Sequence, residues 1–254
     1  MRIARHGAPV LLFLLVLAAW QWLVTAFRVE TWLLPSPIAI VGSVSSSAGL
    51  LGPNLVVTLE ETLVGFFLSL VAGVLVAGGM HLVPRLRDAV YPWVIISQTV
   101  PIIAIAPLLV VWFGFGPASK IIVVVLFAFF PIVVNTYDGL TRVPQGLVRM
   151  ARTFGASRWQ VFRRIEAMWA LPALMSGVRI AITYSVVGAV VGEWVGSEAG
   201  LGYLLIRASS QLETELLFAD VMLLALLGLA LFGLAGLAER IAVPWVREER
   251  MISK

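Results

Sequence analysis

The side chains that usually carry covalent chemistry are scarce in this chain and form no catalytic pattern. There is no cysteine among the 254 residues and the two histidines lie far apart, which excludes thiolate chemistry and leaves no metal-ligand spacing. Glu60 and Glu61 are adjacent, but neighbouring residues on a helix point in different directions. Neither Lys120 nor Lys254 follows a glycine, so there is no GxxxxGKS/T phosphate loop. The sequence predicts no catalytic residues, no bound metal or cofactor, and no ATP site of this kind.

Several polar side chains lie instead within long apolar runs. Polar and ionisable groups inside a bilayer are costly, and they are candidates for function by default. Gln98, Asn135 and Tyr184 are candidates for a polar pathway, and Glu193 for a gate near the outer end of its run. Each of the four could equally make a hydrogen bond between helices. Arg179, early in the run that Glu193 ends, either extends to the membrane interface or has a functional role.

The composition predicts that membrane-spanning helices position these side chains. Of all residues, 60% are hydrophobic and only 13% are charged, whereas a soluble domain carries roughly 25% charged residues. Six runs are long enough to cross a bilayer: 8–27, 56–82, 90–113, 119–139, 173–195 and 216–238. The first run is longer than the apolar region of a cleaved signal peptide, so it counts as a span. We expect an all-α protein with about six transmembrane helices in a single domain, 1–254.

The distribution of basic residues predicts the orientation. If the N-terminus is cytoplasmic, three basic residues (Arg28, Lys120 and Arg207) fall outside and Arg179 falls in the membrane. The other 14 then fall inside: Arg2, Arg5, Arg85, Arg87, Arg142, Arg149, Arg152, Arg158, Arg163, Arg164, Arg240, Arg247, Arg250 and Lys254. This strong positive-inside bias places both termini in the cytoplasm of a multi-pass cell-membrane protein. It also accounts for the net charge of +4 without nucleic acid as a partner.

One cytoplasmic connection, 140–172, carries more information than the others. Pro144 can open a helix, and Gly155 can end that helix in a left-handed conformation. Ser157 and Gln160 have the spacing of a capping box for a second short helix. The connection therefore predicts two short amphipathic helices about a glycine turn.

The apolar and basic faces of these helices leave three interpretations open. Leu147, Met150, Ala151 and Phe154 form a stripe on the first helix, and Val161, Phe162 and Ile165 share a face of the second. The pair could lie on anionic lipid or could dock into the groove of a cytoplasmic partner. A DNA-reading helix-turn-helix is a poor interpretation, because both ends of the loop are fixed to the membrane.

The stretch from Arg149 to Trp159, continuing to Ile165 and to Leu171-Pro172, resembles the cytoplasmic "EAA…G" loop of binding-protein-dependent ABC importer permeases. TVPIIAIAPLLVVWFGFG (99–116), FFPIVVNTYDGL (129–140) and GEWVGSEAGLGYLL (192–205) look like the nitrate/sulfonate/taurine-type branch, which includes permeases for thiamine-precursor pyrimidines. The resemblance implies the type I ABC importer permease fold and an ATPase-coupling loop that contains Arg149, Ala151, Arg152, Phe154, Gly155, Ala156 and Ser157. Arg149 and Met150 depart from the pattern, which has glutamate and alanine there.

The resemblance also implies a working unit. In it, two copies of the permease, embedded in lipid, join two cytoplasmic ABC ATPase subunits that hold ATP and Mg²⁺. An extracytoplasmic solute-binding protein delivers the solute. An ATPase-independent secondary transporter or channel is the alternative, and a membrane-bound enzyme is a third interpretation. The sequence does not identify the solute, which we expect to be a small aromatic or anionic nutrient.

Overall fold

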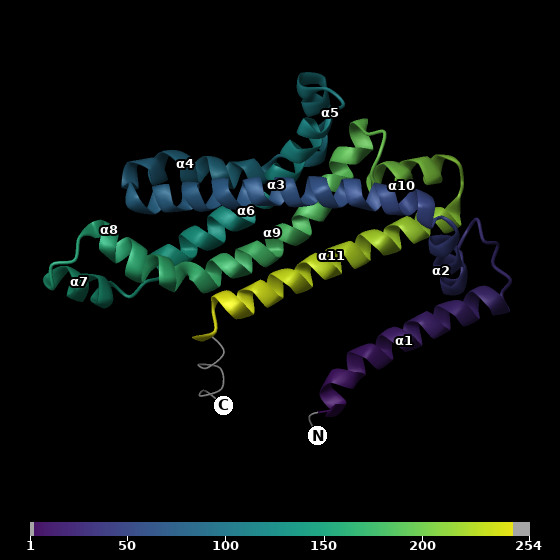
Figure 1. The fold of residues 1–254 in the computed structure, drawn as a ribbon, viewed down its shortest axis with the longest axis horizontal. Helices are drawn as coiled ribbons and strands as arrows, with labels where there is room; N and C mark the ends of the chain where they lie inside the picture. Colours follow the sequence, from purple (N-terminus) through teal and green to yellow (C-terminus); the bar gives the residue numbers. More distant parts are fainter. Residues whose placement is uncertain (1–2, 246–254) are drawn as a thin grey trace.

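The computed structural model describes the backbone of residues 3–245 and the side chains of residues 8–245, and every regular element in this range is a helix (Figure 1). Five of these helices are long and apolar enough to cross a membrane, and a bent pair makes a sixth. The prediction of an all-α protein with about six spans is confirmed. Of the residues in the charge count, Arg2, Arg247, Arg250, Lys254 and the side chain of Arg5 lie outside the described range.

The first three helices contain the first two expected spans. Helix α1 (Ile3–Ala26) contacts the short helix α2 (Pro37–Ser46), and Figure 1 shows it diverging from the other long helices. Ser36 caps α2 by accepting a hydrogen bond from the N–H of Ala39. Helix α3 (Ala48–Leu82) is 35 residues long and begins before the expected span 56–82. It extends along the whole bundle.

The third expected span, 90–113, is not one continuous helix. Helix α4 (Pro84–Ile96) leads into a short 3₁₀ turn (Ser97–Thr99), and α5 (Ile102–Phe113) then leaves at an angle of 101°. Pro101 explains the break, because proline has no N–H and disfavours helical geometry in the residue before it. Val100 is accordingly extended, with φ −86° and ψ 121°. Figure 1 shows α5 projecting from the side of the bundle.

Helix α6 (Pro117–Thr141) is the centre of the bundle and lies between α3 and α9 (Ala167–Gly196). Glycines allow this close packing: a Cβ at Gly65 of α3 or at Gly188 of α9 would overlap Val124 of α6. A Cβ at Gly192 would likewise crowd Lys120. Helix α11 (Thr214–Ala242) packs beside α9.

The remaining helices lie at opposite ends of the bundle (Figure 1). One end, called the loop end below, carries α7 (Gln145–Thr153) and α8 (Arg158–Val161). The other, called the α10 end, carries α10 (Leu201–Ser210). The expectation of a separate second short helix is wrong, because α8 continues through a π-helical turn (Phe162–Glu166) into α9.

Candidate functional site

At the loop end, a small apolar cluster holds α7 against α8. Val143, Val148 and Val161 are buried together, and Ala151 and Ala156 pack against them. The expected stripe of α7 therefore divides between two faces. Ala151 faces inward, whereas the other three members point away from the cluster: Phe154 is 83% exposed, Met150 54% and Leu147 36%. Helix α7 thus presents an apolar outer face that the described chain leaves largely uncovered.

The glycine turn between α7 and α8 has the predicted geometry. Gly155 has φ +85°, in the left-handed region, and the N–H of Ala156 donates to the carbonyl of Ala151 over 3.0 Å, as in a Schellman cap. The hydroxyl of Ser157 accepts from the N–H of Gln160, while the Gln160 side chain accepts from the N–H of Ser157 over 2.8 Å. The capping box is confirmed. No atom beyond the immediate neighbours lies within 4 Å of the position of a Cβ at Gly155.

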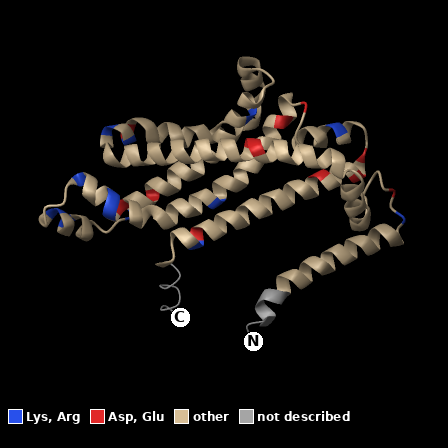
Figure 2. Ribbon diagram, in the orientation of Figure 1, with Lys and Arg blue, Asp and Glu red and all other residues tan. Residues whose placement is uncertain are grey.

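Two side chains tie the loop end to α3, a feature that the sequence did not suggest. The Arg158 guanidinium donates to the carbonyl oxygens of His81 and Leu82, each over 3.2 Å, where the last turn of α3 leaves its carbonyls free. The Glu166 carboxylate lies 2.8 Å from the His81 ring nitrogen. Arg149 and Arg152 are exposed. Figure 2 shows the cluster of basic residues at this end.

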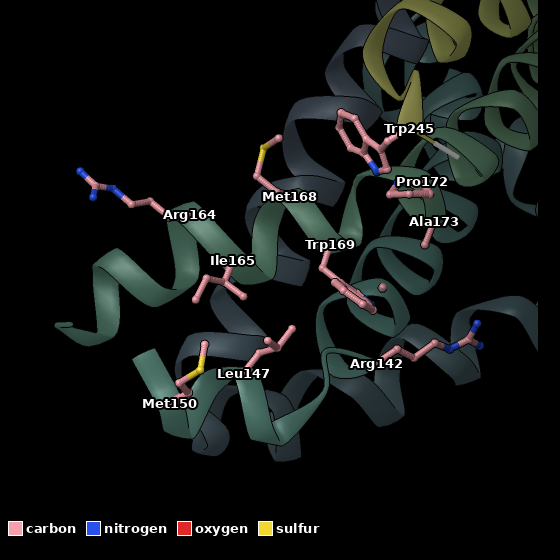
Figure 3. A pocket seen from close by; sticks show the side chains of 11 residues that line it. Arg142, Leu147, Met150, Arg164, Ile165, Met168, Trp169, Pro172, Ala173 and Trp245 are labelled. Atoms are coloured by element: carbon pink, nitrogen blue, oxygen red, sulfur yellow. The ribbon is translucent and has the colours of Figure 1, made fainter. Parts of the chain in front are cut away.

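A cavity of about 670 Å³ lies beneath α7 (Figure 3). Leu147 and Met150 of α7 form one wall, and Ile165 and Trp169 form the facing wall. Its lining is mainly apolar, with Arg142 and Arg164 among its other members. The outer face of α7, with Leu147 and Met150, therefore borders an open space, and the helix is fixed mainly by the valine cluster on its opposite side.

Three of the four predicted pathway residues lie on one cavity of about 460 Å³ beside the break between α4 and α5. Gln98 comes from the 3₁₀ turn, Asn135 from α6 and Tyr184 from α9. The amide nitrogen of Asn135 donates to the carbonyl of Pro131 over 2.8 Å. The structure thus brings together residues from three separate segments of the sequence.

Glu193, the fourth predicted residue, lies apart from this cavity and is 1% exposed. Its carboxylate accepts hydrogen bonds from the Thr58 hydroxyl, over 2.7 Å, and from the N–H of Gly202. Asn54 accepts from the N–H of Gly200 over 2.7 Å, and Thr58 accepts from the N–H of Leu201 over 2.8 Å. Three consecutive N–H groups at the start of α10 are therefore satisfied by side chains of α3 and α9.

Further buried charges surround this capped helix. Lys120 lies 3.0 Å from the Glu61 carboxylate and donates to Ser197 over 2.8 Å. The side chain of Lys120, one of the three basic residues that the charge count placed outside, is only 8% exposed, because α3 and α9 cover it. Asp220 of α11 is also buried, and its carboxylate has no hydrogen-bond partner among the described residues. Sequence reasoning missed this cluster because its members come from four helices.

Arg179 makes an interhelical pair. Its guanidinium lies 3.0 Å from the Glu239 carboxylate of α11 and stands over the ring of Phe232 at 4.3 Å. The sequence left open whether Arg179 extends to the interface or has a functional role; in the structure Arg179 joins α9 to α11.

Comparisons with known proteins place this geometry in a family. A family model described as binding-protein-dependent transport system inner membrane component matches residues 69–245. The chain is 40% identical to the formylaminopyrimidine transport permease protein ThiX of Halalkalibacterium halodurans, over 95% of this chain and 96% of the relative. It is also 40% identical to the riboflavin transport system permease protein RibX of Chloroflexus aurantiacus, over 94% and 90% of the two chains.

Solved structures support the fold. A chain of the MetNI methionine ABC transporter, determined in inward-facing conformations, superposes with a TM-score of 0.69 at 23% identity, covering 78% of this chain and 98% of that one. The expected type I permease fold is confirmed. With its five or six apolar spans and the family match over most of its length, this chain belongs to the inner-membrane permease components of binding-protein-dependent ABC transport systems.

Proposed function

We propose that this permease forms the solute pathway of an ATP-driven importer and couples that pathway to a separate ATPase through the outer face of α7. The exposed Phe154 and Met150 carry this proposal, because a large apolar side chain on a short helix is stabilised when it enters a partner's groove. Arg149 and Arg152 are exposed on the same helix and add charge for recognition. Gly155, Ala156 and Ser157 fix the direction of the helix.

ATP and Mg²⁺ belong to the partner ATPase in this proposal. The sequence has no phosphate loop, and neither lysine follows a glycine. The loop end and both termini are cytoplasmic, an orientation supported by the positive-inside bias of the basic residues. An extracytoplasmic solute-binding protein delivers the solute at the α10 end.

A second copy of the chain completes the pathway. Helix α5 projects from the bundle with Val111 78% exposed and Trp112 67% exposed, which supports a contact with another permease subunit. Lipid covers the divergent helix α1, whose apolar side chains are exposed. We assign Gln98, Asn135 and Tyr184 to the pathway. Glu193 acts at the outer gate by holding α10 in place.

An ATPase-independent transporter or channel would give the apolar outer face of α7 no partner. The discriminating experiment expresses the permease with the ATPase and measures the amount of ATPase that co-purifies. We expect Phe154→Asp and Arg152→Glu to reduce that amount strongly while the permease still inserts. Arg207→Glu, at the α10 end, is the matched control and should retain the ATPase. Normal co-purification with both loop variants would overturn the coupling assignment.

A further inference from the structure

The cavity beside the helix break has a lining whose chemistry favours one class of solute. Phe127, Phe130 and Tyr184 contribute aromatic rings, and Gln98 and Asn135 contribute carboxamides. The other lining residues are proline, valine and isoleucine, so no residue found on this cavity carries a formal charge. A volume of about 460 Å³ is suited to a small organic molecule, for which pockets are roughly 300–1,000 Å³.

The break itself adds backbone hydrogen-bonding groups. Val100, Pro101 and Ile102 line the cavity, and α5 begins at Ile102. The first N–H groups of a helix have no partner within it, and irregular backbone at membrane depth is tolerated where it borders a polar cavity. Pro101 has no N–H, so the N–H groups of Val100 and Ile102 are the backbone donors at this point for carbonyl or ring-nitrogen acceptors on a bound molecule.

Asn135 is held in a fixed position as a further polar group. Its Nδ2 atom donates to the carbonyl of Pro131, which leaves the amide oxygen as an acceptor for another donor. Gly177 of α9 packs so closely that a Cβ there would overlap the Cβ of Asn135. The cavity therefore offers both donors and acceptors beside flat apolar surfaces, which matches the edge and faces of a heterocycle.

Three basic side chains of the described bundle are already paired. Lys120 is neutralised by Glu61, Arg179 by Glu239, and His81 is bonded to Glu166. Burying an anion without a paired cation is expensive. An anionic solute such as a sulfonate would therefore find no uncommitted cationic side chain at this cavity.

We propose that this cavity binds an uncharged, planar heteroaromatic solute, with its faces against the aromatic rings and its edge hydrogen-bonded by Gln98 and Asn135. This inference rests on the pathway role proposed above for the same residues. On this inference the cavity binds nitrate and alkanesulfonates more weakly than an uncharged heterocycle.

The test uses the permease co-purified with its ATPase, without the binding protein, so that only the permease sets selectivity. Equilibrium dialysis measures binding of radiolabelled riboflavin and formylaminopyrimidine as uncharged heterocycles, and of an alkanesulfonate and nitrate as anions. We expect the wild type to bind a heterocycle in preference to both anions. Tyr184→Ala and Asn135→Ala should each weaken that binding by about tenfold, through loss of one stacking or hydrogen-bonding contact.

Thr183→Ala is the matched control, because Thr183 neighbours Tyr184 but lines a different groove, between α9 and α11. It should change heterocycle binding less than about twofold, as expected for a surface change without shared contacts. Gln98→Arg adds a cation to the lining and should shift binding toward the alkanesulfonate. Thermal denaturation of every variant identifies any that binds poorly because it is misfolded.

Preferential binding of an anion by the wild type would overturn this inference, as would binding of no probe or unchanged heterocycle binding in both cavity variants. The amount of co-purified ATPase is recorded on the same samples. If no ATPase co-purifies with the wild type, the result counts against the proposed function. If the ATPase co-purifies but the permease prefers an anion, only the solute assignment is refuted.

Discussion

The two ends of the permease use the same device, a glycine with positive φ followed by a capped helix, but they build it from different residues. At the loop end, Gly155 precedes a helix capped by Ser157 and Gln160, all within six residues. At the α10 end, Gly200 (φ +109°) precedes a helix whose N–H groups are satisfied from α3 and α9. The surroundings of the two glycines also differ. A Cβ at Gly155 would meet open space, while a Cβ at Gly200 would overlap the Glu193 carboxylate.

The difference shows what each end is suited to do. The Gly155 turn carries its own caps, so its geometry can be kept when it moves with a partner, and Arg158 and Glu166 connect that movement to α3. A turn fixed by side chains of two other helices moves only when those helices move. The loop end is thus suited to receive motion, and the α10 end to report the arrangement of the bundle.

The largest difference between the two ends should appear on replacing the two glycines by alanine. Gly200→Ala should destabilise the protein by about 3 kcal/mol or more, because strained backbone and overpacking add. Gly155→Ala should cost only about 1–2 kcal/mol from the backbone alone. Thermal denaturation of the purified permease measures both. Equal shifts in midpoint would show that the α10 end is no more tightly built than the loop end.

The second prediction concerns the cap that Glu193 provides. Glu193→Ala leaves the buried N–H of Gly202 without its acceptor, which should cost about 1–3 kcal/mol, and solute uptake should fall while the complex still assembles. Glu193→Gln keeps an acceptor oxygen and should retain most of the stability. Paired uptake assays and denaturation midpoints test this. Full uptake by the alanine variant across a solute titration would remove Glu193 from the gate.

The third prediction concerns coupling through the loop. Gly155→Val should insert and express normally, but it should lose uptake and solute-stimulated ATP hydrolysis together, since valine disfavours positive φ and tilts α7. Gly155→Asn is the control, because asparagine tolerates this conformation. Normal coupling in the valine variant would contradict the role of the loop.

Much of the loop end could be predicted from the sequence because its determinants are local. Gly155, Ser157 and Gln160 are close neighbours, so turn and capping rules apply directly. The continuation of α8 into α9 was missed, although no glycine or proline lies between Arg158 and Leu171 to end a helix. The stripe of α7 was recognised, but only tertiary contacts determine that Val148 packs inward and Phe154 outward.

The α10 end could not be predicted in the same way. Glu193 was identified as notable because it is ionisable, but its partner Thr58 is 135 residues away. The pairing of Lys120 with Glu61 likewise depends on how α3 and α6 pack. The third span was expected as one run, 90–113, and its 101° bend is seen only in the structure. Contacts between distant helices leave no fixed spacing in a single sequence.

The length of α3 has a mechanical consequence. Arg158 and Glu166 hold it near His81 at the loop end, and Asn54 and Thr58 hold α10 near its other end. At ~1.5 Å per residue, about 40 Å of continuous helix separates Asn54 from His81. A continuous helix is stiff over this distance, so in the proposed assembly a force applied at the loop end would displace the α10 end without any intermediate relay. By reciprocity, a protein bound at the α10 end of that proposed assembly would alter the nucleotide affinity of the ATPase by the same factor as nucleotide alters the affinity for that protein.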